Sequence, residues 1–174
     1  QEDIVSEIRS LMEVAIKGQL VSDVPVGVLL SGGIDSSIIT AYAAKHYSKK
    51  IDTFSAGFDF DKGVNELPMA RKVSNYFNTN HHELQISGEK LPQVLEELVG
   101  HHGVPFGDAA NIPLYLISKE LNGSHKVVLQ GDGGDEMFGG YRSYQLLKNH
   151  SFWSFASRFS FFLKGLPTSD SVNR

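Results

Sequence analysis

The sequence has no cysteine, no long apolar run and little net charge. Without cysteine, disulfides, thiolate metal ligands and a cysteine nucleophile are excluded within this chain. No run of about 18 apolar residues occurs, so no membrane-spanning helix is predicted. The chain has 16 basic and 20 acidic residues, and the resulting net charge of −4 is a poor match for duplex nucleic acid. These absences leave chemistry that carboxylates, hydroxyls and backbone groups can perform.

The composition is that of one ordinary globular domain. Hydrophobic residues make up 41% and charged residues 21% of the 174 residues. These values are untypical of disordered or collagen-like chains. The chain starts Gln-Glu-Asp without an initiator methionine, and from this start we expect a processed chain or a piece of a longer one.

Short apolar runs alternate with amphipathic stretches along most of the sequence. This alternation is typical of a parallel sheet in which helices form the crossovers. We therefore predict an α/β fold, a doubly wound parallel sheet with helices on both faces, within a domain of residues 1–150. Strands are predicted at 26–30, 51–58, 82–87 and 126–130, and helices at 3–20, 38–46, 66–77, 91–101 and 112–121.

Aromatic residues gather near the end of the chain. Phe152, Phe155, Phe159 and Phe162 share one face of a predicted helix. Such a face requires a partner surface. One interpretation is a helix packed on this domain. The other, which we favour, is that residues 151–174 begin a helical C-terminal extension.

A serine- and glycine-rich turn, SGGIDSS at 31–37, follows the first predicted strand. Gly32 and Gly33 remove Cβ atoms, so backbone N–H groups can face an anion at the start of the next helix. The motif lacks the lysine of the P-loop and does not match the dinucleotide pattern GxGxxG. Asp35 beside a polyphosphate requires a divalent cation, for which Mg²⁺ is the candidate. The motif predicts a phosphate cradle, and the alternative is a glycine turn with Asp and Ser caps.

A second turn rich in glycine and carboxylates, GDGGDEMFGGY at 131–141, follows the last predicted strand. Ligands of open parallel sheets gather at the carboxyl ends of the strands, where both turns begin. If the two strands are near neighbours, Asp35 and Asp135 can share one Mg²⁺. The alternatives are an acidic loop without a ligand and a Ca²⁺ loop. Asp132 and Asp135 stand three residues apart, which does not fit the EF-hand spacing.

Two histidine groups, at 81–82 and 101–102, suggest metal sites at first sight. Adjacent residues of a strand point to opposite faces, so each pair offers at most one ligand to a given site. We therefore expect these histidines to be exposed or to have hydrogen-bond partners within the protein.

Three further polar residues have two interpretations each. Asp108 and Asn111 precede a predicted helix, either as substrate-binding groups or with Asn111 as the N-cap. Glu136 is either catalytic or paired with a nearby base such as Arg142.

Three segments together resemble the synthetase domain of the asparagine synthetase family and its amidotransferase relatives. They are SDVPVGVLLSGGIDSS at 22–37, FSAGFD at 54–59 and GDGGDEMFGGY at 131–141. NELPMARKVSNYF, HHEL and PFGDAANIPLY resemble the same family between these segments, and the similarity covers most of residues 20–145. The family is part of the PP-loop ATP-pyrophosphatases, so the resemblance implies an adenine nucleotide alpha hydrolase-like fold.

The resemblance implies an ATP-dependent ligase that forms an amide. A substrate carboxylate, for which aspartate is the first candidate, attacks the α-phosphate of ATP to give an acyl-adenylate and pyrophosphate. Ammonia then displaces AMP. It implies catalytic roles for Asp35, Asp132 and Asp135, with Asp35 and Asp135 as Mg²⁺ ligands and Asp132 orienting or deprotonating the amine. The residues implied to bind ATP and pyrophosphate are Leu30, Ser31, Gly32, Gly33, Asp35, Ser36, Ser37, Ala56, Gln130 and Gly131.

The partners implied by the resemblance are a small-molecule carboxylate and ammonia from a glutaminase domain that this chain lacks. A cytoplasmic enzyme is implied, and a homodimer is left open. The family's synthetase domain continues past residue 174 and carries a lysine there that stabilises the transition state, so we expect this chain to be inactive alone.

Gln130 stands where the family often has serine, which leaves a sugar acid or another carboxylate open as the acceptor. Two alternative functions also stay open. One is another PP-loop adenylating enzyme, which modifies a tRNA base or makes NAD or GMP. The other is a Mg-ATP-binding module without turnover.

Overall fold

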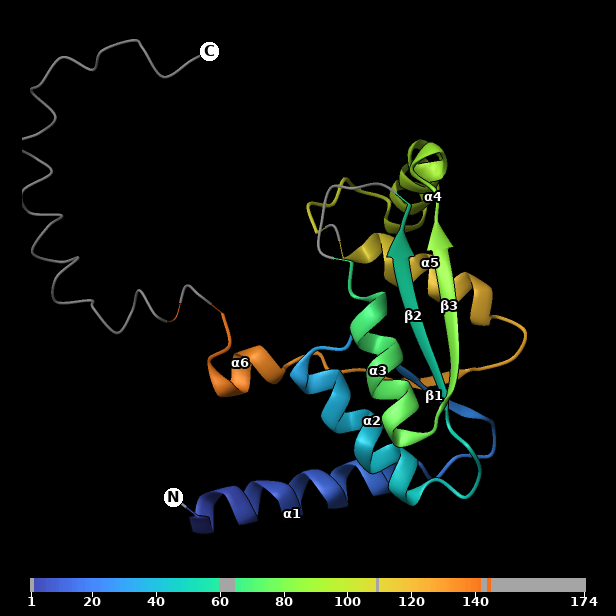
Figure 1. The fold of residues 1–174 in the computed structure, drawn as a ribbon. Helices are drawn as coiled ribbons and strands as arrows, with labels where there is room; N and C mark the ends of the chain where they lie inside the picture. Colours follow the sequence, from blue (N-terminus) through green and yellow to red (C-terminus); the bar gives the residue numbers. More distant parts are fainter. Residues whose placement is uncertain (1, 60–64, 109, 142–143, 145–174) are drawn as a thin grey trace, which may run out of the picture. The chain divides into compact units, whose positions relative to one another are not determined.

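The computed structural model describes residues 2–59, 65–108, 110–141 and 144 (Figure 1). The chain forms two compact units, Gln1–Gly131 and Asp132–Arg174. The aromatic segment at 151–174 lies outside the described residues. Of the helices that are described, none combines the length and apolarity needed to cross a membrane.

The first unit alternates helices and strands along the chain. Its helices are α1 (Glu2–Gln19), α2 (Ile34–His46), α3 (Leu67–Phe77), α4 (Leu91–His102) and α5 (Asn111–Leu121), with a 3₁₀ turn, η1 (Gly88–Lys90), before α4. Its strands are β1 (Val26–Leu29), β2 (Asp52–Phe58), β3 (Asn80–Ile86) and β4 (Val127–Leu129). The described part of the second unit contains one helix, α6 (Gly134–Phe138).

The four strands form one parallel sheet in the order β3-β2-β1-β4. β1 therefore has β2 on one side and β4 on the other. In register, Val28 pairs with Thr53 of β2 and with Leu129 of β4. The predicted α/β fold with a parallel sheet is confirmed.

Helices cover both faces of this sheet because the strand side chains alternate between two apolar clusters. On one face, Val26 and Val28 pack with Ile16 of α1 and Ala43 of α2. On the other face, Phe54 packs with Ile117 and Leu121 of α5, with Leu29, Ala56, Leu84 and Val128 against them. Each fully buried valine or leucine stabilises the fold by about 1.5–3 kcal/mol relative to exposure.

The largest difference from the predicted elements is the start of α2. Sequence pattern indicates a helix from residue 38, but α2 begins at Ile34, with Gly33 as its N-cap. The hydroxyls of Ser36 and Ser37 donate to the Gly33 carbonyl, so these polar residues fit into the first helical turn. The glycine-rich turn is therefore confined to residues 31–33.

Candidate functional site

The turn between β1 and α2 is held together by its own serines. Ser31 Oγ lies 3.0 Å from Ser36 Oγ and accepts a 3.2 Å hydrogen bond from the Gly33 N–H. Ser37 Oγ donates to the Gly33 carbonyl at 2.6 Å. The predicted serines therefore organise the turn, and the bonds of their hydroxyls to Gly33 fix the N-cap of α2, the end at which a helix attracts anions.

Gly32 allows a second helix to approach this turn. Its φ is +84°, in the left-handed region that favours glycine. A Cβ at Gly32 would stand 2.7 Å from the backbone nitrogen of Ala70 and 2.9 Å from the carbonyl carbon of Met69. These two atoms belong to the first turn of α3, so the starts of both α2 and α3 lie at the glycine turn. Two helix N-termini provide more partial positive charge than one.

Gly131 brings the end of β4 to the same place. An added Cβ there would lie 3.1 Å from Asp35 Cβ and 3.1 Å from the Ser36 nitrogen. The carboxyl ends of β1 and β4 are thus adjacent, as the shared-site hypothesis requires. β1 has β2, the next strand of the sequence, on one side and β4 on the other, so the strand order reverses here. Open α/β sheets bind ligands at the carboxyl ends of the strands at such a topological switch point.

The remaining residues predicted to bind the nucleotide lie in or beside the strands. Leu30 is buried, its N–H donates to the Phe54 carbonyl at 2.8 Å, and its own carbonyl accepts from Ser55 Oγ. Ala56 is half-buried on the α5 face of β2, and Gln130 is exposed just after β4. The backbone of Leu30 thus joins β1 to β2 beside the glycine turn. The roles of these residues toward adenosine stay predictions.

In the second unit, a five-residue helix that carries two of the predicted carboxylates has a glycine as the cap at each end. Gly133 is the N-cap of α6 with a φ of 92°, and Gly139 is its C-cap with a φ of 71°. Asp135 is half-buried in the first turn, and its carboxylate occupies the space that a Cβ at Gly140 would need. Asp132 is exposed just before this helix.

Glu136 has a partner that sequence reasoning did not identify. Tyr141 Oη donates a 2.6 Å hydrogen bond to Glu136 Oε1. This bond lowers the pKa of Glu136 and raises the pKa of Tyr141 to about 12. Arg142, the predicted base, lies outside the described residues. A catalytic role for Glu136 stays a prediction.

The donor set suits a metal ion shared with a ligand better than a cage made by the protein. Within residues 2–59, 65–108, 110–141 and 144, no group of three or more histidine or carboxylate side chains is arranged to hold a metal ion. Mg²⁺ in nucleotide sites is usually held by one or two carboxylates together with phosphate oxygens and waters. Asp35, half-buried in the first turn of α2, fits that mode. Its sharing of an ion with Asp135, in the other unit, stays a prediction.

Asp108 and Asn111 mark the start of α5 differently from the prediction. The N-cap is Ala110, and Asn111 is the first helical residue, so the prediction that Asn111 caps the helix is wrong. Asp108 Oδ1 accepts the Ala110 N–H at 2.9 Å and so supplies an acceptor two positions before the cap. A substrate role for either residue stays a prediction.

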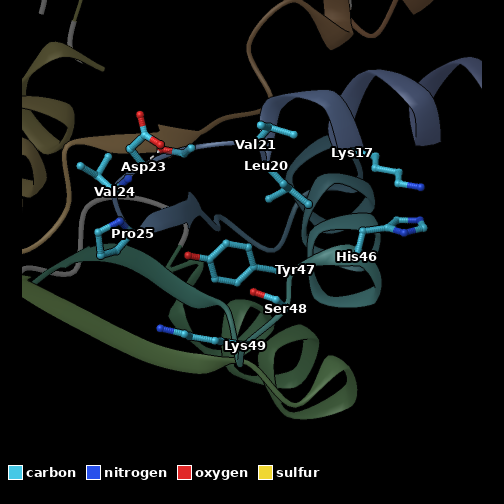
Figure 2. A pocket seen from close by; sticks show the side chains of 11 residues that line it. Lys17, Leu20, Val21, Asp23, Val24, Pro25, His46, Tyr47, Ser48 and Lys49 are labelled. Atoms are coloured by element: carbon cyan, nitrogen blue, oxygen red, sulfur yellow. Dashed lines mark hydrogen bonds between the residues drawn. The ribbon is translucent and has the colours of Figure 1, made fainter.

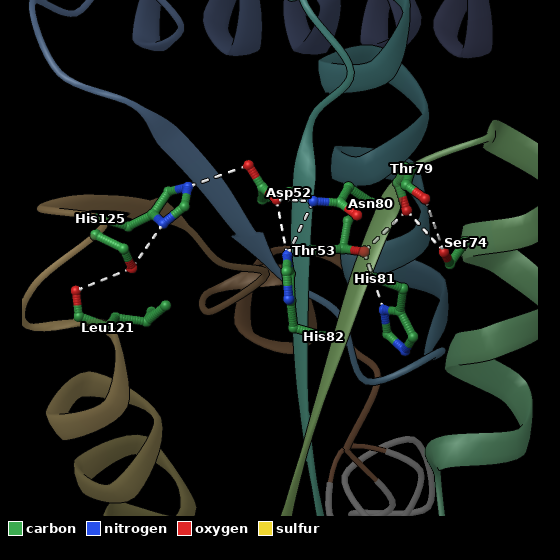
Figure 3. Close-up of polar contacts among 10 residues, drawn as sticks. Asp52, Thr53, Ser74, Thr79, Asn80, His81, His82, Leu121 and His125 are labelled. Carbon is green, nitrogen blue, oxygen red and sulfur yellow. Dashed lines mark hydrogen bonds and ion pairs between the residues drawn. The ribbon is translucent and has the colours of Figure 1, made fainter.

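The histidines at 81–82 lie on β3 and use opposite faces of the sheet (Figure 3). His81 Nδ1 lies 3.0 Å from Thr53 Oγ1, and its Nε2 lies 3.4 Å from Glu83 Oε1. Arg71 binds both carboxylate oxygens of Glu83. His82 Nε2 lies 2.8 Å from Asp52 Oδ1.

His101 and His102 are exposed in the last turn of α4. The His101 ring lies beside Tyr115, and the His102 ring lies beside Phe106. Sequence reasoning missed Asp52 and His125, whose Oδ2 and Nε2 atoms lie 3.3 Å apart. The available signal was an acidic residue at the start of an apolar strand.

Acidification is expected to lower the free energy of unfolding in two stages. Burial holds the pKa of His81 below its ordinary value of 6.5. As the pH drops below about 6.5, His81 is therefore protonated in the unfolded chain before it is protonated in the folded chain, and the free energy of unfolding falls. The hydrogen bond from Arg71 lowers the pKa of Glu83 below 4.5, and this contribution is lost as the pH falls further, through the folded-state pKa. Urea unfolding between pH 3 and pH 8 measures both stages. His81→Asn should remove the first stage alone, and an unchanged profile in that variant contradicts the assignment.

A depression of about 450 Å³ lies at the other end of β1, between the end of α1 and the turn after α2 (Figure 2). Leu20, Val21 and the Tyr47 ring line it, together with Lys17 and Lys49. The Tyr47 hydroxyl accepts the Val26 N–H at 3.2 Å, so its polar end supports β1. None of the predicted site residues lines this depression.

The sequence matches the family model described as asparagine synthase over residues 7–171. It is 37% identical over 145 residues to asparagine synthetase [glutamine-hydrolyzing] 1 of Bacillus subtilis, covering 83% of this chain and 23% of that protein. A putative asparagine synthetase [glutamine-hydrolyzing] 2 of Methanocaldococcus jannaschii is 35% identical, with 83% and 28% covered. Asparagine synthetase [glutamine-hydrolyzing] 3 of Arabidopsis thaliana is 37% identical, with 77% and 25% covered.

The chain spans about a quarter of the length of these curated relatives. Its fold is similar to that of an NH3-dependent NAD synthetase from Campylobacter jejuni, with a TM-score of 0.53 at 14% identity over 78% of this chain and 60% of that one. This second likeness concerns the fold alone. The sequence relatives and the family model, which covers nearly all of the chain, together establish that this chain belongs to the asparagine synthase family.

Proposed function

We propose that this chain is the nucleotide-binding part of an ATP-dependent ligase that forms an amide. It activates a carboxylate, for which aspartate is the first candidate, as an acyl-adenylate, with pyrophosphate as the leaving group of this step. Ammonia then displaces AMP. The observation that carries the proposal is the turn at 31–33, where the starts of α2 and α3 and the end of β4 meet in a chain of this family.

The backbone of this turn supplies the binding chemistry for pyrophosphate. A leaving pyrophosphate gains negative charge, which fixed N–H groups and helix dipoles stabilise without reorganisation. The serine hydrogen bonds hold the turn in one shape before any ligand arrives. Because neither Gly32 nor Gly131 carries a side chain, the start of α3 can approach the turn closely and the end of β4 can approach the first turn of α2. The same site binds ATP first and retains pyrophosphate after the α-phosphate has been attacked.

Mg²⁺ would neutralise the negative charge of the phosphates. Asp35, in the first turn of α2, would hold it, with Asp135 as the second protein ligand. Asp132 orients or deprotonates the incoming amine. The relatives' names describe glutamine-hydrolysing enzymes, which supports ammonia from glutamine as the nitrogen source. Gln130, exposed after β4, is a candidate for distinguishing aspartate from other carboxylates.

Titration calorimetry of the chain with α,β-methylene-ATP tests the nucleotide site. We expect binding that requires Mg²⁺, because Asp35 repels the phosphates when no cation lies between them. A folded chain, shown by circular dichroism, that binds no analogue with or without Mg²⁺ contradicts the proposal that these residues form a nucleotide site. In a longer protein that contains this chain, ATP–pyrophosphate exchange that depends on the added carboxylate identifies the acyl substrate.

A further inference from the structure

Figure 3 shows a charged cluster around Asp52. It lies at the amino ends of the strands, whereas the glycine turn follows the carboxyl end of β1. The centre of the cluster is Asp52, the first residue of β2. Asp52 Oδ1 lies 2.8 Å from His82 Nε2 of β3 and also accepts a hydrogen bond from the Asn80 amide. Asp52 Oδ2 lies 3.3 Å from Nε2 of His125, which precedes β4. One carboxylate therefore connects three segments that are far apart in the sequence.

The contact with His125 spans a strand. β2 and β4 are not neighbours, because β1 lies between them. At the level of this contact β1 carries Gly27, which pairs with Asp52 on one side and Val128 on the other. A Cβ at Gly27 would stand 2.6 Å from the Phe54 ring and 3.4 Å from His125 Cδ2. The missing side chain thus leaves the space through which His125 reaches Asp52.

His125 is buried in a way that makes Asp52 its main electrostatic partner. Its side chain is 10% exposed, and its Nε2 is buried, close enough to Asp52 for an ion pair but not aligned for a hydrogen bond. Its Nδ1 lies 3.1 Å from Ser124 Oγ, and its ring meets Phe54 edge-on at 5.0 Å. A buried charge without a partner is costly, so an imidazolium here depends on Asp52.

The other groups around Asp52 are few. Among the described residues, the titratable side chains that act most strongly on Asp52 are His82 and His125. β1 presents Gly27, and α5 contributes apolar residues to this face. Burial raises the pKa of Asp52, but the bonds from His82 and Asn80 and the charge on His125 together hold it below its ordinary value. Asp52 therefore stays negative when a histidine beside it changes charge.

β4 is the element that this contact can position. It has three residues, lies at an edge of the described sheet and pairs there with β1. Its far end leads to Gly131, which abuts the first turn of α2. We propose that Asp52 and His125 form a proton-dependent tether that fixes β4 on β1 and thereby holds Gly131 against the first turn of α2. His125 is thus a positioning residue, and its effect on nucleotide affinity rests on the proposed function.

Amide hydrogen exchange in β4 (Val127–Leu129), measured at the amides that donate to β1, tests the tether without any nucleotide. Histidine changes charge between about pH 5 and pH 8, so exchange is compared at about pH 6 and pH 8. His125→Gln and Asp52→Asn should each speed exchange about tenfold over the wild type at pH 6, and that ratio should fall toward one at pH 8. The ratio to wild type at the same pH cancels the intrinsic pH dependence of exchange.

His82→Gln is the matched control, because His82 also binds Asp52 but lies on β3. It should leave the exchange of the β4 amides unchanged at both pH values. Equal acceleration at both pH values, a ratio near one at pH 6, or the same acceleration in all amides of the sheet overturns the tether. If the variants do not fold, NMR of the wild type decides. There the Val128 and Leu129 amide shifts should titrate with the same midpoint as the His125 ring, and a different midpoint overturns the proposal.

Nucleotide titration forms the second arm. At about pH 6, His125→Gln should bind Mg-α,β-methylene-ATP about fivefold more weakly than the wild type, with His82→Gln unchanged. If the wild type binds and His125→Gln binds equally well, the positioning role is wrong while the nucleotide site stands. If the wild type does not bind, the proposed function fails, and the exchange arm still decides whether the tether exists.

Discussion

Replacing Gly32 by alanine is expected to abolish nucleotide binding and to lower the free energy of unfolding by about 3 kcal/mol. Two costs add in this substitution. An alanine at a φ of +84° pays about 1–2 kcal/mol for the left-handed conformation. Its Cβ would also stand 2.7 Å from the Ala70 nitrogen, and the start of α3 must then move. Because α3 and the turn at 31–33 are displaced together, the phosphate-facing N–H groups lose their arrangement.

Urea unfolding and titration with Mg-α,β-methylene-ATP measure the two parts of this effect. Gly100→Ala is the matched control, since Gly100 lies in α4 and an added Cβ there meets nothing within 4 Å. That change should raise stability by about 0.5–1 kcal/mol, because alanine is the better helix former. If Gly32→Ala keeps wild-type stability, the tight approach of α3 to the turn is wrong. If stability falls but affinity persists, the turn is structural only.

The sheet was predictable because its strands are short apolar runs, such as Val26–Leu29, between turn residues. The glycine turn was predictable because Gly32 and Gly33 interrupt that pattern at a strand end. The start of α2 was not, since Ser36 and Ser37 indicate a loop until their hydroxyls are seen to donate to the Gly33 carbonyl. The polarity of Ser36 and Ser37 does not by itself indicate which acceptors their hydroxyls bind.

The cluster around Asp52 depends on information that no local pattern contains. Asp52 and His125 are 73 positions apart in the sequence, and they meet across β1, which lies between β2 and β4 in the sheet. They meet because Gly27 carries no side chain between them. Strand order and an empty position on a third strand must both be known. The sequence showed an acidic residue in an apolar strand, but not its partner.

Replacing Asp35 by asparagine is expected to weaken binding of the Mg²⁺ complex of α,β-methylene-ATP about 100-fold, on the order of 3 kcal/mol. The fold should stay intact for two reasons. Asparagine has nearly the same shape and keeps the Cβ that lies near Gly131. In addition, no hydrogen bond or ion pair of the Asp35 carboxylate occurs among the described residues. An equal thermal unfolding midpoint for wild type and variant checks this point.

The sharper readout is the dependence on Mg²⁺. Without the cation, Asp35 repels the phosphates, so removing its charge should leave affinity for the free analogue equal to that of the wild type or higher. With the cation, the wild type gains affinity and the variant gains little. The ratio of affinities with and without Mg²⁺ should therefore fall toward one in Asp35→Asn and stay at the wild-type value in Asp23→Asn, an exposed carboxylate before β1. A variant that keeps the wild-type ratio shows that Asp35 does not bind the metal, because a neutral amide cannot replace the carboxylate's charge toward the cation.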